Sequence, residues 1–181
     1  KNGFGVNRQD LMYNDFVIVG PKSNPAKVKI TDDPIKVFTK IYNTSSIFIS
    51  RGDDSGTHFK EMQIWKTSKL DPTKFSGDWY KETGSGMGTT LNLANGMEAY
   101  TLTDRASWIN FKNKNNLKIV AEKNQILFNQ YGITMVNPLK CPNVKVKNAK
   151  IFISWLLSET GKNSISNFKI KNQQLFFPNR N

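Results

Sequence analysis

The sequence predicts an α/β fold in which helices flank a mostly parallel β-sheet. Short apolar runs rich in β-branched residues predict strands buried on both faces, as in parallel sheets with helical crossovers. These runs alternate with segments whose apolar residues recur at helical spacing, which is typical of the α/β class. With 181 residues, of which 38% are hydrophobic, the chain is long enough to form one or two lobes.

The first half of the chain establishes this alternation. Phe16–Val19 is an unbroken apolar run that a glycine and a proline bring to an end, which predicts a strand. Asp32 opens a segment with a proline in its first turn and apolar residues at helical spacing, which predicts a helix. A second strand is expected at 46–50. The helix after it carries large apolar residues three positions apart, Phe59, Met62 and Trp65.

The second half continues the same pattern. A shorter element is expected at 79–82, and strands are expected at 99–103 and 128–137. A glycine-rich turn at 84–88 opens a helix that ends near Gly96, and Asp104 caps another helix. A last pair of helices is expected at 148–157 and just before the apolar segment 173–178. The apolar positions of the first three of these helices are Met87, Leu91 and Ala94; Trp108, Ile109 and Phe111; and Phe152, Ile153, Leu156 and Leu157.

The composition favours anionic partners. The formal net charge is +12 at pH 7, and such a surface concentrates anions. Nucleic acid is not expected, because the basic residues are spread from end to end without interleaved stacking aromatic residues. A genome biased toward lysine and asparagine would explain the charge equally well.

Neither a metal nor a cofactor is expected. The one cysteine, Cys141, excludes an internal disulfide, and with the one histidine, His58, it leaves no Cys/His metal cluster. No apolar stretch approaches the roughly 20 residues of a spanning helix. The first residues lack the apolar core of a signal peptide, so a mature exported protein, a cytosolic protein and a fragment all fit these features.

The segment 48–60, FISRGDDSGTHFK, predicts an anion site. A strand ends at Ser50, and a polar turn with two glycines leads into a helix. The first amides of a helix lack intrahelical partners, and the helix dipole makes them attractive to anions. The residues expected to offer such donors are Ser55, Gly56 and Thr57, and Ser50 at the end of the strand is a further candidate ligand-binding residue.

Arg51 is the cation of this segment. It follows the carboxyl end of a strand, where open α/β sheets bind ligands, and its fork of donors suits a tetrahedral oxyanion. An equally good interpretation is structural: Asp54 or Ser55 only caps the helix, while Arg51 pairs with Asp53.

Two further turns are candidates for the same site. In the segment 83–90, TGSGMGTT, glycines before a helix permit an anion nest, which adds Met87 and Gly88 to the candidate ligand-binding residues. The segment lacks the lysine of a P-loop and the glycine spacing of a dinucleotide fingerprint. Thr103, at a strand end with Arg105 nearby, is a third candidate. A glycine turn and a helix cap explain these features about as well.

The sequence does not predict an enzyme. It contains no nucleophile elbow and no carboxylates paired around a pocket, and His58 directly follows Thr57. The DDSG string also fails the spacing of a calcium loop. Polar turns at strand ends with no reactive group between them indicate a binding site.

Six strings in this order resemble the tungstate-binding TupA family of periplasmic solute-binding proteins: MYNDFVIVGP, SRGDDSGTH, WYKETGSGMG, AYTLTDRASW, FNQYGI and FFPN. The resemblance covers essentially the whole chain. It implies a type II periplasmic-binding-protein fold, with two α/β lobes, an oxyanion in the cleft, and crossover strands at Phe16–Val19 and near Tyr131. It also implies that Arg51 is a principal ligand contact, with Ser55 and Thr57 beside it.

The resemblance implies a biological setting as well. The protein would be the substrate-binding component of an ABC importer, capturing tungstate or molybdate and presenting it to a membrane permease. It would be made with a signal peptide and would be periplasmic, or lipid-anchored outside the cell.

The resemblance further implies that the first lobe is incomplete. Residues 1–19 would be the end of the first lobe and the first crossover strand, 20–130 the second, oxyanion-contacting lobe, and 131–181 the second crossover and the return to the first lobe. The apolar faces near 132–136 and 149–157 would then lack partners. Either further residues of the protein complete these faces, or the chain self-associates through them.

Two other functions fit the same sequence. The anion loop of phosphate-binding proteins has a similar spacing to that of Arg51, Asp53, Ser55, Gly56 and Thr57. In those proteins an aspartate at the position of Asp53 accepts the proton of hydrogen phosphate. If tungstate binds, Asp53 must turn away or pair with Arg51. The effector-sensing domain of a transcription regulator has the same fold, although no helix-turn-helix segment is present.

Overall fold

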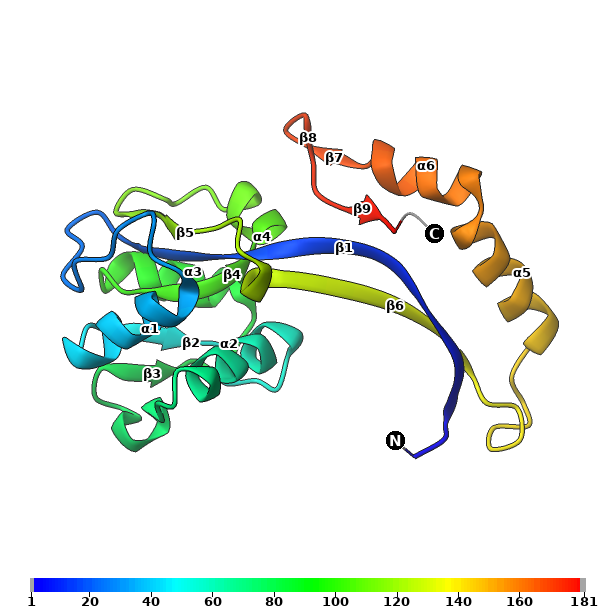
Figure 1. The fold of residues 1–181 in the computed structure, drawn as a ribbon, viewed down its shortest axis with the longest axis horizontal. Helices are drawn as coiled ribbons and strands as arrows, with labels where there is room; N and C mark the ends of the chain where they lie inside the picture. Colours follow the sequence, from blue (N-terminus) through cyan, green and yellow to red (C-terminus); the bar gives the residue numbers. More distant parts are fainter. Residues whose placement is uncertain (1, 180–181) are drawn as a thin grey trace. The chain divides into compact units, whose positions relative to one another are not determined.

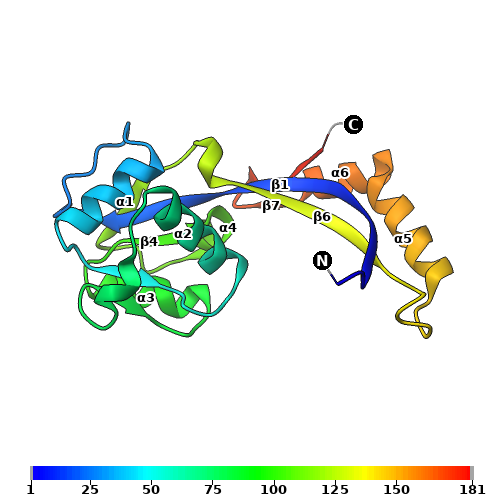
Figure 2. The same cartoon turned by 60° about the horizontal axis from the view of Figure 1, so that its bottom comes forward.

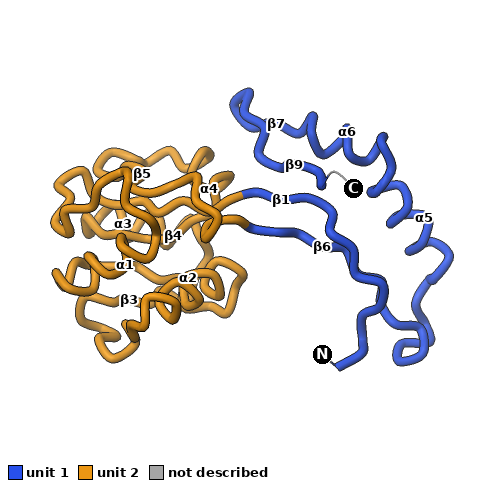
Figure 3. The backbone as a smooth tube through the Cα atoms, viewed as in Figure 1, with its two compact units in different colours: residues 1–14, 129–181 blue, residues 15–128 orange. Residues whose placement is uncertain are grey.

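The computed structural model describes residues 2–179 and separates into two units (Figure 3). Unit 1 comprises residues 1–14 and 129–181, and unit 2 comprises residues 15–128. The outermost residues of the expected ranges 1–19 and 131–181, residues 1 and 180–181, lie outside the described residues.

Unit 2 contains five strands in the order β3-β2-β4-β1-β5, in which the pair β2-β3 is joined to β4-β1-β5 by a bridge at Tyr100, directly before β4. Its strands are β1 (Gly5–Pro21, shared with unit 1), β2 (Phe48–Ser50), β3 (Tyr80–Glu82), β4 (Thr101–Asp104) and β5 (Leu117–Ala121). Strand β2 is parallel to β3, and a parallel bridge between Phe48 and Tyr100 joins it to β4. Strand β1 is antiparallel to both β4 and β5.

The α/β class is therefore confirmed, but the sheet is mixed and not mostly parallel. The three strands β2, β3 and β4 have the expected parallel direction, whereas β1 has the opposite one. A continuous apolar run reports burial on both faces and carries no information on strand direction. Phe16–Val19 is buried as expected, with exposed fractions of 0–3%.

Helices cover both faces of this sheet (Figure 1). Alternate residues of β1 face opposite sides: Phe16 and Ile18 pack in one core, Val17 and Val19 in the other. Helices α1 (Pro34–Asn43) and α2 (Gly56–Thr67) contribute to the first core, and α3 (Met87–Gly96) and α4 (Arg105–Asn110) to the second. Short 3-10 turns are η1 (Pro72–Phe75) and η2 (Gln125–Leu127).

The buried face of α2 differs from the expected stripe. Trp65 is fully buried, but Phe59 is 78% exposed. The residues of α2 that face the interior are Thr57, Glu61, Ile64 and Trp65. A glutamate therefore holds a core position. A hydrophobic pattern cannot reveal this, because a charged residue is normally assigned to the solvent face.

An ion-pair network in unit 2 joins the start of α4 to the middle of β1 and the end of β5. Arg105, the first residue of α4, donates to both carboxylate oxygens of Asp15 in β1 at 2.7 and 2.5 Å. Its other terminal nitrogen lies 2.8 Å from Glu122, just after β5. These carboxylates raise the pKa of the Arg105 guanidinium against the effect of burial, Asp15 having the larger influence.

In unit 1, strand β6 (Phe128–Val136) runs alongside β1, as both views show (Figures 1 and 2). Strand β1 also pairs antiparallel with β9 (Phe177–Pro178). The remaining elements are α5 (Val146–Leu157), α6 (Glu159–Asn167), β7 (Lys169–Ile170) and β8 (Gln173–Gln174). The strand expected at 128–137 and the helix expected at 148–157 are therefore confirmed.

Helix α5 has no buried residue within the described part of the chain. Its exposed large residues, with their exposed fractions, are Ile151 (60%), Phe152 (56%) and Trp155 (43%). Over residues 2–179, each helix is too short or too polar to cross a bilayer.

Candidate functional site

Three polar turns meet at one edge of the sheet in unit 2. Strands β2, β3 and β4 are parallel, so their carboxyl ends lie at the same edge, and the chain then enters α2, α3 and α4. The amide of Thr83 donates to the carbonyl of Ser50 at 3.0 Å, and its hydroxyl donates to the carbonyl of Arg51 at 3.2 Å. The structure thus gathers the three turns that the sequence singled out.

Arg51 lies at this edge of the sheet, and only some of its guanidinium donors have hydrogen-bond partners in the protein. One terminal nitrogen donates to Asp53 at 2.5 Å, and the side chain is 20% exposed. Its Nε is buried and has no hydrogen-bond partner among the described residues. A buried guanidinium donor without an acceptor is costly, so this group favours an additional acceptor at the site.

Asp53 is turned toward Arg51 and the start of α2. Its second oxygen accepts the amide of Ser55 at 3.2 Å. Burial raises the pKa of the Asp53 carboxyl, but hydrogen bonds from Ser55 and Arg51 outweigh this and hold the pKa below its ordinary value. The Arg51–Asp53 pair, which was the structural interpretation of this turn, is therefore confirmed.

The first turn of α2 offers fewer free donors than expected. The hydroxyl of Ser55 caps the helix by accepting the amide of His58 at 3.3 Å, and the Ser55 amide is occupied by Asp53. The expectation of a free Ser55 amide was therefore wrong, because the nearby carboxylate competes for it. The amides of Gly56 and Thr57 donate to no acceptor within residues 2–179, and open space lies beside Gly56.

The second turn presents backbone and not side chains. Gly86 precedes α3 without a side-chain cap, and a methyl group added at Gly86 or Gly88 would meet nothing within 4 Å. The Met87 side chain is only 7% exposed and packs in the second core. At Met87 and Gly88 it is therefore the backbone amide, and not a side chain, that is available to a ligand.

The hydroxyls of Ser50 and Thr103 are committed to protein acceptors. Both residues are fully buried. Ser50 donates to Glu61 at 2.8 Å, and Thr103 donates to the carbonyl of Asp104 at 3.2 Å. Arg105 is likewise held by its carboxylate partners. The sequence located these strand ends but could not reveal which way each side chain points.

Glu61 is the residue of this region that sequence reasoning missed. It is 1% exposed and accepts hydrogen bonds from Ser50, Tyr80 (2.8 Å) and Trp65 (3.2 Å). Burial raises the pKa of its carboxyl to about 7, even though these three hydrogen bonds oppose the shift.

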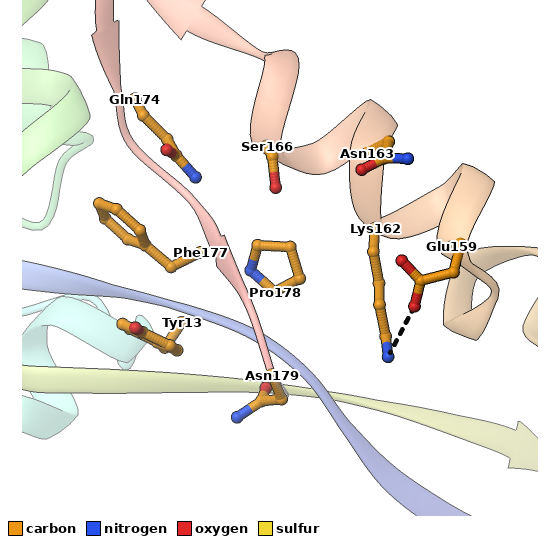
Figure 4. Close-up of a pocket in the computed structure, with 9 residues that line it drawn as sticks. All are labelled: Tyr13, Glu159, Lys162, Asn163, Ser166, Gln174, Phe177, Pro178 and Asn179. Atoms are coloured by element: carbon orange, nitrogen blue, oxygen red, sulfur yellow. Dashed lines mark ion pairs between the residues drawn. The ribbon is translucent and has the colours of Figure 1, made fainter. Parts of the chain in front are cut away.

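A cavity of about 500 Å³ lies elsewhere, in unit 1, between α6 and β9 (Figure 4). Lys162 on its wall is 3.8 Å from Glu159, and the lining residues include no arginine. It does not contain the predicted anion donors. No three His, Cys, Asp or Glu residues in the described part of the chain are grouped as a metal site.

The chain is similar to known proteins over most of its length. The protein-family model described as "PBP superfamily domain" matches residues 1–160. A relative described as tungstate-binding protein TupA, from Peptoclostridium acidaminophilum, is 43% identical over 92% of this chain. The chain spans 58% of that relative's length.

Two solved structures are similar over most of the chain. One is the tungstate-binding protein TupA from Desulfovibrio alaskensis G20, with a TM-score of 0.84, 42% identity, and coverage of 99% of this chain and 72% of the other. The second is the tungstate ABC transporter structure from Geobacter sulfurreducens, with a TM-score of 0.78, 44% identity, and coverage of 92% and 70%.

Proposed function

The chain belongs to the TupA family of the PBP superfamily, and on that premise we propose that it is the oxyanion-contacting part of the substrate-binding component of an ABC importer. Tungstate or molybdate is the proposed ligand. The observation that carries this proposal is Arg51, whose Nε lacks a partner among the described residues. It belongs to the same turn as Gly56 and Thr57, whose amides have no acceptor in the part of the chain that the structure describes.

In the proposed complex, fixed donors surround a doubly negative tetrahedral anion. Arg51 provides charge-assisted hydrogen bonds, and the amides of Gly56 and Thr57 add the positive end of the α2 dipole. The amides of Met87 and Gly88 and the hydroxyls of Ser55 and Thr57 complete the proposed contacts. Ser50 and Thr103 are proposed to support the turns, because their hydroxyls already have protein acceptors.

We also propose roles for the two units, a location for the protein and a partner in the membrane. Unit 2 is proposed to be the oxyanion-contacting lobe, for which the sequence predicted residues 20–130. The ranges 1–19 and 131–181 remain assigned to the other lobe and the crossovers. We further propose that the protein is periplasmic, docks on a membrane permease and is not an enzyme, because the site supplies donors and no reactive group.

Calorimetric titration with tungstate, molybdate, sulfate and phosphate at one pH tests the function. We expect tungstate and molybdate to bind more tightly than phosphate, because the Asp53 carboxylate is engaged by Arg51 and Ser55. Tighter binding of phosphate would favour the alternative, in which Asp53 accepts the proton of a protonated oxyanion. The absence of binding to all four anions would refute the proposal.

We also propose that the chain self-associates through the exposed apolar face of α5. Apolar surface that lacks a partner favours association, and Phe152 lies in this face. Light scattering is expected to give a mass above 20.6 kDa for the unmodified chain and a lower mass for Phe152→Lys. Phe59→Lys, at an exposed phenylalanine of unit 2, is the control and should leave the mass unchanged. A monomeric unmodified chain would contradict this proposal.

A further inference from the structure

A buried carboxylate lies directly behind the anion turn. Glu61 accepts the Ser50 hydroxyl, and the Ser50 oxygen in turn accepts the amide of Gly52 at 3.2 Å. Ser50 and Gly52 are the two chain neighbours of Arg51. Glu61 therefore restrains the backbone on both sides of the arginine, through one hydroxyl.

The turn has little freedom to adopt another path. Gly52 has a φ of +56°, and a Cβ at this position would lie 2.8 Å from the Cβ of Glu82. The conformation that places Arg51 therefore depends on a glycine and on the hydrogen bond from its amide to Ser50. Loss of the Glu61–Ser50 contact would loosen this support.

We propose that Glu61 is a positioning residue of the anion turn and that its charge state sets the strength of oxyanion binding. This inference rests on the proposed function. An ionised Glu61 accepts all three of its hydrogen bonds but adds a buried negative charge behind a site for a dianion. A protonated Glu61 removes that repulsion, and its O–H is able to donate to Ser50, which frees the serine hydroxyl hydrogen.

Other titratable and charged groups lie near Glu61, and any of them could also couple oxyanion binding to pH. Tyr80 is its hydrogen-bond donor from β3, and burial together with Glu61 raises the pKa of that phenol above its ordinary value. Glu82, on the same strand, raises the pKa of Glu61 further. On α1, which packs against α2, Lys36 and Lys40 are paired with Asp32. The turn itself contributes the Arg51–Asp53 pair, and α2 contributes His58.

The direction of the pH effect follows from the charges. The Glu61 carboxyl has a pKa of about 7 without ligand, and a bound dianion favours its neutral form, so binding raises that pKa further. Between the ligand-free pKa and the higher ligand-bound pKa, binding therefore takes up a proton. Affinity is expected to be highest below about pH 7 and to fall as the pH rises through this value.

The test is the pH profile of tungstate affinity, measured by calorimetry on the unmodified chain and on Glu61→Gln. Glutamine keeps an acceptor for Tyr80 and provides a donor for Ser50, but it does not titrate. The dissociation constant of the unmodified chain is expected to rise roughly tenfold between about pH 6 and about pH 9, the effect of a one-unit pKa shift in one linked group. That of Glu61→Gln is expected to stay nearly constant.

Two further measurements test whether Glu61 is the group that causes the pH dependence. His58→Gln, which removes the one imidazole of the chain from the same helix, is the matched control and should retain the pH dependence of the unmodified chain. Calorimetry in buffers of different ionisation enthalpy should detect proton uptake at about pH 8 without any substitution. A flat profile in the unmodified chain, or the same slope in Glu61→Gln, would overturn this inference alone. Failure to bind tungstate at every pH would instead overturn the proposed function.

Discussion

Replacing Arg51 with alanine is expected to weaken tungstate binding at least tenfold, which corresponds to about 1.4 kcal/mol or more. The guanidinium provides charge-assisted hydrogen bonds, and its removal also leaves Asp53 without its cation. An unpaired carboxylate in the turn would repel a dianion. Calorimetric titration of the variant against tungstate measures the loss.

Two matched variants identify the cause of that loss. Arg51→Lys keeps the charge but loses the planar fork of donors, so we expect an affinity between those of the unmodified chain and Arg51→Ala. Arg8→Ala removes an exposed arginine of unit 1 and changes the net charge equally, so we expect no change. Equal affinity of Arg51→Ala and the unmodified chain would remove Arg51 from the site.

Replacing Trp65 with alanine is expected to lower the free energy of unfolding by roughly 3–5 kcal/mol, as is typical of large buried aromatic residues. The ring is fully buried and packs against Phe38 and Phe48, with ring centroids 4.3 and 5.4 Å away. Truncation would leave a cavity and would also remove the indole donor to Glu61. Denaturant unfolding followed by circular dichroism measures the change.

Trp155→Ala is the matched control for this prediction. Trp155 lies on α5 and is 43% exposed, so truncation is expected to cost much less stability than at Trp65. Similar losses for the two variants would contradict the packing difference described for these residues.

Most elements of the fold were predictable because their patterns are local. Phe16–Val19, the helix after Asp32 and the helix capped by Asp104 all appear in the structure. Strand β5, Leu117–Ala121, was not predicted, because its five residues include a lysine and follow an asparagine-rich turn. The antiparallel direction of β1 was also beyond the pattern, since strand direction depends on partners distant in the sequence.

The position of the candidate site was more predictable than its chemistry. Strand ends followed by polar turns located Arg51, and pairing with Asp53 was one of two interpretations that the sequence allowed. The inward direction of Ser50 and Thr103 was not predictable, because it depends on tertiary partners. Glu61 was missed for the same reason: its three donors come together only in the folded chain.

The restraints on Arg51 affect the entropy cost of binding an oxyanion. A free arginine side chain loses up to about 2 kcal/mol of rotamer entropy when it is immobilised. Here the contact with Asp53 and the glycine-dependent path at Gly52 limit that freedom in the chain without ligand. Much of the ordering therefore accompanies folding. Arg51 is therefore preorganised for the ligand, and ordering its side chain should cost little conformational entropy when an oxyanion binds.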